Sequence, residues 1–514
     1  MAVTDKDIIP GGSFLIRDTP PQEVFTPEDL SDEQKMMGKV TREFVEADVK
    51  PKAEQIEHQD WDLTVKLFRK AGELGLLSVD LPTKYGGLGL DLITSVVIAE
   101  RLIEGGSFAI SVFDHVGIGS LPIAWFGNAE QKARYLPLLA TGAKIGSYAL
   151  TEPGSGSDAL AAKTKAVLSP DGKFFILNGT KQFITNAAFA DLYITYAKVD
   201  GDKFSAFIID RDTPGATLGA EEKKMGIKGT STRSVILDNA KVPVENLLYE
   251  VGKGHKVAFD ILNIGRFKLA AGCLGTCKVA LRESVKYAKQ RTQFGQSIAS
   301  FGLIQKKLAE MAIRTYVAES IVYRTGGLIE AILSGIDQGS EAAGLEAAKG
   351  VEEYAVECSI NKVYVSEALD YVADVPRRTD LPGCEDQPHL RGDQRDQPAA
   401  DPRHALPEGL AGAPSTLDRG AEVDGRPALL QPRSGRGAQG PAWGPDPNAS
   451  VEQEDRADGV RRRRAEVPRE PAGGTGDAGD PERPDDRALR HGERAAPGAQ
   501  VSGRRGGEGG RGQV

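Results

Sequence analysis

The residues best suited to binding a ligand lie in a short run rich in glycine and serine, Thr151 to Asp158. Small side chains there let a ligand approach the backbone closely, and the hydroxyl and N–H groups could hold phosphate or ring oxygens. The run lacks the Lys-Ser/Thr pair of a P-loop, and it is not a Gly-x-Gly-x-x-Gly run that opens a helix after a strand. A linker is the commoner explanation of such a composition. Spacing alone leaves both interpretations open.

Other candidate residues also have ordinary structural explanations. Phe183 could be a core aromatic residue, and Arg266 could be a solvated helix residue. Cys273 and Cys277 lie four residues apart on a stretch rich in glycine and alanine, which suits small buried packing residues. We therefore assign no metal ligand and no catalytic side chain from spacing. The histidines before residue 375 are too scattered for a metal site or a serine triad: His58, His115 and His255.

Helical patterns precede this run. Residues 1–25 carry proline and glycine without periodicity, so we expect an extended arm. Residues 26–147 show apolar residues at helical spacing and are predicted to form a helical domain. Thr26-Pro27 is a good helix start, and Ser31 with Gln34 offers a second capping box just inside it.

Strand patterns follow in residues 148–250, which we predict to be a β domain. Lys173 to Leu177 reads as a strand that ends in a hairpin turn at Asn178-Gly179. From 251 to 374 helical periodicity returns in long runs, so the fold class is α+β, with a helical, a β and a helical domain in that order. Three further short strands are predicted at Leu192 to Tyr196, Phe204 to Ile209 and Arg233 to Leu237.

The composition changes abruptly at residue 375. Residues 376–514 contain no Lys, Ile, Met, Phe or Tyr, and Trp443 is their one aromatic residue. Such a segment cannot bury enough apolar surface to offset its chain entropy. We therefore expect residues 375–514 to be a disordered tail.

The averages over the 514 residues describe a mildly acidic chain, with a net charge of -9 and 27% charged residues. No stretch approaches the roughly 20 apolar residues that cross a bilayer, so we expect no transmembrane segment. The N-terminus lacks a basic region followed by a long apolar run, which argues against a secretory signal. Four cysteines without a Cys-x-x-Cys pair argue against a disulfide scaffold and favour the reducing cytoplasm.

The chain carries four distinctive segments, in order: Tyr148 to Asp158 (Tyr-Ala-Leu-Thr-Glu-Pro-Gly-Ser-Gly-Ser-Asp), Lys181 to Asn186 (Lys-Gln-Phe-Ile-Thr-Asn), Asn263 to Arg266 (Asn-Ile-Gly-Arg) and Arg291 to Gly295 (Arg-Thr-Gln-Phe-Gly). Together they resemble the acyl-CoA dehydrogenase family. The similarity runs from about Thr26 to Asp374 and is greatest to the very-long-chain branch and its bacterial members. It implies a helical domain, a β domain and a C-terminal helical bundle, here truncated, which agrees with the patterns above.

The resemblance implies FAD as the cofactor. Thr151 would lie near the pyrimidine edge of the flavin, and Ser157 near the flavin phosphate or acyl-CoA. Phe183 and Ile184 would pack on the isoalloxazine, with Thr185 bonding the N5 region, although many relatives have Trp in place of Phe183. The residues so implied are Tyr148, Leu150, Thr151, Gly156, Ser157, Phe183, Ile184 and Thr185, with Arg291, Gln293 and Phe294 reaching the FAD of a neighbouring subunit.

The resemblance also implies α,β-dehydrogenation of an acyl-CoA thioester, with Ser157, Asn263 and Arg266 contacting the substrate. A carboxylate would remove the α-proton while a hydride leaves for the flavin. One branch carries this base immediately before the Arg, where this chain has Gly265. The other carries it in a C-terminal Phe-Glu-Gly-Thr segment, which this chain lacks, together with the Gln-x-x-Gly-Gly stretch that precedes it. No catalytic residue is therefore assigned.

The tail offers an explanation for the missing base. Residues 375–404, written as degenerate codons and read one base later, permit a Phe-Glu-Gly-Thr segment within thirty consecutive family-like residues. We infer a deletion after Asp374 that shifted the reading frame. An evolved disordered tail is the alternative.

Three functions follow as hypotheses. The first is an FAD-dependent acyl-CoA dehydrogenase of fatty acid β-oxidation, for medium to very long chains, that assembles as a homodimer or homotetramer. It would pass electrons to an electron-transfer flavoprotein, with impaired activity in this frame. The second is a non-catalytic flavin- or acyl-CoA-binding protein. The third is nucleic-acid binding through Arg461 to Arg464, which the interspersed acids and scarce aromatic residues oppose, so we expect no nucleic-acid partner.

Overall fold

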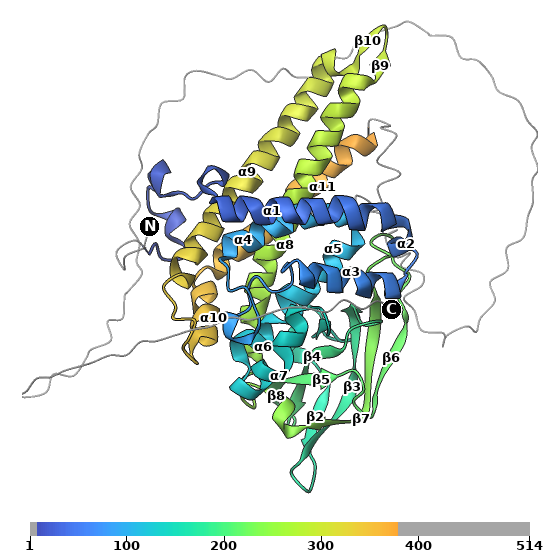
Figure 1. Ribbon diagram of the computed structural model, residues 1–514, viewed down its shortest axis with the longest axis vertical. Helices are drawn as coiled ribbons and strands as arrows, with labels where there is room; N and C mark the ends of the chain where they lie inside the picture. The colour runs from blue at the N-terminus through green and yellow to red at the C-terminus, as the bar shows by residue number, and fades with distance from the viewer. Residues whose placement is uncertain (1–7, 379–514) are drawn as a thin grey trace, which may run out of the picture. The chain divides into compact units, whose positions relative to one another are not determined.

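The computed structural model describes residues 8–378, which all lie within one unit of the chain (Figure 1). Residues 1–7 of the arm lie outside this range. So do the predictions of a disordered, frame-shifted tail and of its basic run, Arg461 to Arg464, which fall on residues 379–514. The last helix, α11 (Ala355–Arg378), passes the predicted boundary at residue 375.

The N-terminal arm lies along the last helices of the chain. The hydroxyl of Tyr354 donates to the carbonyl of Ile9 at 2.7 Å, and the N–H of Gly12 donates to the Glu357 carboxylate at 2.6 Å. The arm is therefore fixed to the C-terminal helical domain by its backbone. Its short 3₁₀ turns are Ser13–Leu15 and Pro21–Glu23.

The first domain is helical, as predicted. Thr26 begins only a 3₁₀ turn, Pro27–Asp29, and the first α-helix starts after Ser31. The predicted capping box sets that start, because the N–H of Gln34 donates to Ser31 Oγ at 3.2 Å while Gln34 Oε1 accepts from the Ser31 N–H at 2.8 Å. The helices are α1 (Asp32–Phe44), α2 (Ala53–Glu57), α3 (Trp61–Glu73), α4 (Leu92–Leu102), α5 (Ser107–Phe113), α6 (Leu121–Phe126) and α7 (Ala129–Ala140).

One stretch of this domain is more apolar than the sequence analysis recognised. Ser107–Phe126 spans 20 residues with a mean hydropathy of 1.3, so it is long and apolar enough to cross a bilayer. In the structure 78% of its apolar window is buried inside the protein, and a π-helical segment, Asp114–Gly119, separates α5 from α6. Its apolar character is accounted for by the protein core.

The middle domain is a mixed sheet of eight strands within the described residues, in the order β6-β7-β3-β2-β4-β5-β8, with β1 parallel to β4. The three further predicted strands correspond to β4, β5 and β7, each longer than expected. The strands are β1 (Gly146–Ala149), β2 (Lys165–Leu168), β3 (Phe174–Thr185), β4 (Leu192–Val199), β5 (Lys203–Asp210), β6 (Ala216–Glu221), β7 (Thr232–Pro243) and β8 (Leu247–Leu248).

The predicted hairpin turn at Asn178-Gly179 is wrong. Strand β3 runs through both residues, and its register with β7 shifts between Leu177 and Gly179, so this pair forms a bulge. A Cβ on Gly179 would lie 2.4 Å from Thr164 Oγ1, so glycine is needed there for close packing. The turn into β3 lies earlier, where Gly172 has a φ of 69° and the Ser169 N–H donates to the Phe174 carbonyl.

The third domain consists of long helices, as predicted. Figure 1 shows α8 and α9 extending side by side beyond the rest of the unit, with the β9–β10 hairpin at their far end. The elements are α8 (Gly254–Gln290), β9 (Thr292–Gln293), β10 (Gln296–Ser297), α9 (Gly302–Leu333), α10 (Ala343–Glu353) and α11.

The largest buried hydrophobic cluster joins all three domains. It includes Val96 of α4, Tyr148 of β1, Ile208 of β5 and Phe267 of α8. Because the first strand of the sheet packs between the two helical domains, the Gly/Ser-rich run that follows it emerges at their junction. The core therefore determines where the candidate site lies.

Candidate functional site

The Gly/Ser-rich run is a tightly closed turn. Glu152 and Ser155 exchange backbone hydrogen bonds of 2.9 and 3.0 Å, which close the turn over Pro153 and Gly154. The N–H of Gln182 on β3 donates to the Thr151 carbonyl at 2.8 Å. The run is thus closed on itself and fixed to the sheet at Thr151, unlike a flexible linker.

A buried ion pair lies beneath this turn. Lys181 Nζ lies 2.7 Å from Glu152 Oε1, and both side chains are almost fully inaccessible. The same carboxylate accepts the Thr164 hydroxyl at 2.5 Å and the Lys163 N–H at 2.5 Å, while Lys181 also donates to the Leu150 carbonyl at 3.2 Å. Burial would raise the pKa of Glu152, but Lys181 and the other donors outweigh it and hold that pKa below its usual value.

The predicted site residues of the first motif, Tyr148 to Asp158, occupy two environments. The Tyr148 ring is buried, and its hydroxyl lies 3.4 Å from the Ala258 carbonyl of α8. Leu150 and Thr151 are partly buried, whereas Gly156 and Ser157 are exposed. The closed turn therefore presents small residues to solvent above a charged, buried anchor.

The second predicted segment lies directly beside the first. Phe183 has a left-handed backbone (φ 60°) and a ring that is 57% exposed, while Ile184 next to it is buried. The β3–β7 register shifts between Lys181 and Ile184, so a bulge turns the Phe183 ring out of the sheet. The Ser147 hydroxyl donates to the Thr185 carbonyl, which ties β3 to β1. An aromatic residue held outward on strained backbone is typical of a functional surface.

The third segment lies on the helix that packs against Tyr148. Arg266 Nη1 donates to Asn263 Oδ1 at 2.8 Å on α8. At 1.5 Å of rise per residue, Asn263 lies about 7.5 Å along this helix from Ala258 and Arg266 about 12 Å. Gly265 between them has no side chain, and a Cβ there would lie 3.3 Å from Ile118 Cγ2.

The fourth segment lies apart from the other three. Arg291, Gln293 and Phe294 belong to the β9–β10 hairpin at the far end of α8 and α9, and all three are exposed. Phe294 is 92% exposed with a φ of 51°. The fold of one chain does not bring this hairpin to Tyr148 or Phe183, so its expected contact with a neighbouring subunit's cofactor stays a prediction.

The motifs do not reveal the anchor of the turn. Lys181 and Glu152 each belong to a motif, but their spacing in the sequence assigns no role to either. A lysine among the buried residues of β3 is the signal that could have revealed it, because buried lysines need a partner.

Cys273, Cys277 and His115 lie within the fold. Burial raises the pKa of the Cys273 thiol to about 11 and that of Cys277 further. His115 lies buried between the Gly146 N–H and the Leu139 carbonyl, and burial lowers its pKa to about 4. Among residues 8–378, no three His, Cys, Asp or Glu side chains are grouped to hold a metal ion.

The three domains, with the anchored turn at their junction, define a class of α–β–α proteins. Acyl-CoA dehydrogenase family models match the chain in the same order, with the N-terminal domain at residues 31–143, the middle domain at 147–240 and the C-terminal domain at 252–375. The chain belongs to the acyl-CoA dehydrogenase family.

Individual relatives agree with this assignment. A probable acyl-CoA dehydrogenase of Bacillus subtilis is 55% identical over 374 residues, 73% of this chain and 63% of that protein. An acyl-CoA dehydrogenase of the same organism is 40% identical over 353 residues, 68% of this chain and 91% of that protein. Mammalian very long-chain specific acyl-CoA dehydrogenases also match, in agreement with the branch suggested by the motifs. This chain covers less than two thirds of the length of the first of these relatives.

A solved structure shares the fold. The acyl-CoA dehydrogenase complexed with FAD from Bacillus anthracis superimposes with a TM-score of 0.73 at 52% identity, covering 74% of this chain and 67% of that one.

Proposed function

We propose that this chain binds FAD at the junction of its three domains and derives from an enzyme that dehydrogenates acyl-CoA thioesters at the α,β bond. The observation that carries the proposal is the convergence of two segments, Tyr148–Thr151 and Phe183–Thr185, beside one anchored turn. The named FAD complex of the Bacillus anthracis relative supports the choice of cofactor.

The residues present suit a flavin. The exposed ring of Phe183 offers a flat apolar surface, and a Cβ added at Gly154 or Gly156 would meet nothing within 4 Å, which leaves open space over the turn. Phe183, Ile184 and Thr185 would hold the ring system, while Tyr148, Leu150, Thr151, Gly156 and Ser157 would line its edge and phosphates. When bound, FAD would supply the two-electron oxidation.

The chain's own residues would then bind and orient the substrate. We assign Asn263, Arg266 and Ser157 to acyl-CoA, with the Arg266 guanidinium already oriented by Asn263. We propose medium to very long acyl chains, because relatives with this sequence pattern are named as very long-chain enzymes. Removal of the α-proton needs a carboxylate, and position 265 on α8 holds a glycine. We therefore propose that this chain turns over poorly.

A base introduced at position 265 tests this proposal. Gly265→Glu places a carboxylate beside Arg266, at the cost of a small shift of Ile118 away from the new Cβ. We expect the purified wild-type protein to be yellow, and its flavin absorbance to persist when acyl-CoA is added anaerobically. Acyl-CoA should bleach the flavin absorbance of the Gly265→Glu variant. It should not bleach that of Gly265→Gln, whose side chain is of equal size but is not a base.

The outcome separates the hypotheses. A wild-type rate similar to that of Gly265→Glu would overturn the proposed impairment. Bound flavin with acyl-CoA affinity but no bleaching in any variant would favour the non-catalytic flavin- or acyl-CoA-binding protein. A protein without flavin would contradict both.

The exposed hairpin supports a proposal about assembly. We assign Arg291, Gln293 and Phe294 to the FAD of a second subunit, because Phe294 is almost fully exposed at the end of two long helices. A homodimer or homotetramer would bury it, and an electron-transfer flavoprotein would reoxidise the cofactor in fatty acid β-oxidation. Phe294→Ala should lower flavin content and shift the sedimentation coefficient towards the monomer. A flavin-replete oligomer in this variant would contradict the assignment.

We place the protein in the cytoplasm. The described cysteines are free thiols, Cys273, Cys277 and Cys358, and such residues persist in a reducing compartment.

A further inference from the structure

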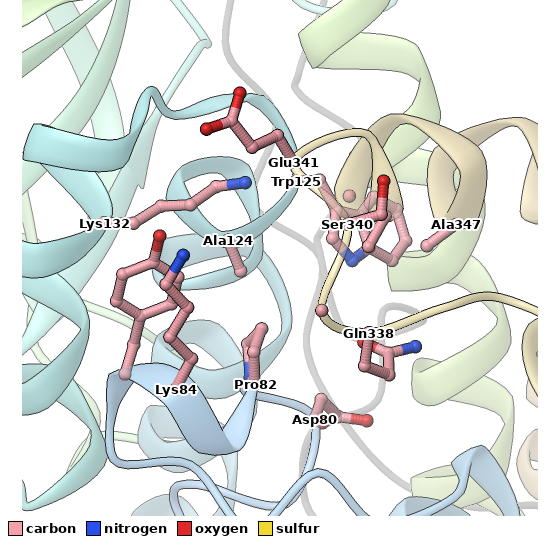
Figure 2. Close-up of a pocket in the computed structure, with 14 residues that line it drawn as sticks. Asp80, Pro82, Lys84, Ala124, Trp125, Lys132, Gln338, Ser340, Glu341 and Ala347 are labelled. Atoms are coloured by element: carbon pink, nitrogen blue, oxygen red, sulfur yellow. The ribbon is translucent and has the colours of Figure 1, made fainter. Parts of the chain in front are cut away.

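A cavity that shares no lining residue with the Gly/Ser-rich turn lies between the loop before α4, helices α6 and α7, and the start of α10. Its volume is about 60 Å³, and Figure 2 shows the side chains around it. The charged residues among them are Lys84, Lys132, Glu341 and Asp80. None of them belongs to the proposed FAD or acyl-CoA site.

Lys132 of α7 is a largely buried lysine whose ammonium group has no counter-ion among the described residues. Its side chain is only 9% exposed and points into the cavity (Figure 2). Among residues 8–378, no carboxylate lies within 4 Å of Lys132 Nζ and no acceptor bonds it. A buried charge is costly unless it is paired and hydrogen-bonded. Burial first, and Lys84 second, lower the pKa of Lys132, while Glu341 opposes them.

A second ammonium group enters the same cavity. Lys84 approaches from the side of Tyr85, with its Nζ 5.5 Å from the centre of that ring. Asp80 does not neutralise the pair, because it is bonded to Lys268 and Ser95. Glu341 lies on the exposed loop before α10 and forms no ion pair within 4 Å among the described residues. Positive charge therefore exceeds the negative charge available to it.

The opposite wall adds a helix N-terminus. Helix α10, 11 residues long, begins at Ala343 without a side-chain cap, and Gly344 lines the cavity. The N–H groups of Gly344 and Leu345 donate to no acceptor among the residues that the structure describes. A Cβ on Gly344 would lie 2.5 Å from the Trp125 carbonyl, so close packing on α6 holds this end of the helix against the cavity. Free N–H groups at a helix N-terminus favour an anion.

We propose that this cavity binds an oxyanion of the size of phosphate, held by Lys132, Lys84 and the N-terminus of α10. Phosphate carries about −1.5 to −2 charges near pH 7 and several strong acceptor oxygens, which matches two ammonium groups and free N–H donors. The anion is either free phosphate or the phosphate group of a larger molecule. This site is independent of the proposed FAD function.

Titration of the full chain with inorganic phosphate tests the proposal, by calorimetry and by melting temperature at constant ionic strength and pH. Wild-type protein should show saturable binding and a rise in melting temperature, since a ligand of the folded state stabilises it. Lys132→Met should weaken binding at least about tenfold. The control variant Lys165→Met should leave phosphate binding unchanged, because Lys165 is an exposed residue of β2.

Two further variants show whether a weaker response to phosphate reflects lost binding rather than misfolding. Lys84→Met should weaken binding, whereas Glu341→Gln should strengthen it, because the competing carboxylate is removed. Equal phosphate responses in wild type and Lys132→Met, or no saturable response in wild type, would overturn the proposal. Titration with glycerol 3-phosphate identifies the source: tighter binding than phosphate indicates a phosphate ester, and weaker binding indicates the free anion.

Discussion

Two lysines of this protein lie largely within the fold but have opposite surroundings, Lys181 being fully buried and Lys132 9% exposed. Lys181, under the Gly/Ser-rich turn, is paired with Glu152 at 2.7 Å and also donates to the Leu150 carbonyl. Lys132, in the cavity at the start of α10, has no partner among the described residues. The paired lysine fixes a loop from within the fold. The unpaired one leaves a charge that the fold does not satisfy, which is the mark of a place for a ligand.

The largest expected effect is from removing one half of the paired site. Lys181→Met leaves the Glu152 carboxylate buried without its cation, so the free energy of unfolding should fall by about 3–5 kcal/mol. Urea unfolding measures it, and the flavin content of the purified variant should fall as the turn loses its anchor.

The neutral pair is the matched control. Glu152→Gln combined with Lys181→Met removes both charges, so most of the lost stability should return. A double variant as unstable as Lys181→Met would show that the hydrogen bonds, rather than the charge balance, fix the turn.

A third buried basic group, His115, predicts that the free energy of unfolding depends on pH. The expected change is almost as large as that of Lys181→Met. Its pKa is about 4 in the folded state, below the ordinary 6.5, so the unfolded chain binds the extra proton first as pH falls. Stability should be complete above pH 6.5 and decline between pH 6.5 and 4 by about 3 kcal/mol. Denaturant midpoints across this range measure it, with exposed His58→Gln as the control. The same decline in stability should be measured in His58→Gln. If no decline is seen between pH 6.5 and 4, a neutral His115 is contradicted.

Lys132→Met should have the opposite sign to Lys181→Met. Without phosphate, removing an unpaired buried charge should raise the free energy of unfolding by about 1 kcal/mol or more. Thermal and urea unfolding in phosphate-free buffer would detect it. A loss of stability would mean that Lys132 serves the fold, and the comparison between the two lysines would fail.

An exposed ion pair should give the smallest change in the free energy of unfolding. Lys39 and Glu43 are 3.8 Å apart on α1, with both side chains largely exposed. Lys39→Met should change the free energy of unfolding by less than about 0.5 kcal/mol in urea. A larger change would mean that the urea assay does not isolate the effect of burial.

Much of the fold was predictable because its signals are local. The Ser31–Gln34 capping box and the short apolar strands between Leu192 and Ile209 depend on neighbours within a few residues. The Asn178-Gly179 pair also carries a local turn signal, but contact with Thr164, the residue before β2, overrides it, and the pair forms a bulge. The assignments of the individual site residues remain predictions, since they rest on resemblance.

The sequence by itself determined the order of the three domains and the family, because hydrophobic period and ordered motifs are written along the chain. Only the tertiary structure decided which buried charges have partners. Glu152 lies 29 residues from Lys181, and the sheet brings them together, whereas Lys132 and Lys84 share a cavity with the start of α10, some two hundred residues later. Pairing of charges depends on distances in space, and these are fixed by packing between elements that the sequence lists far apart.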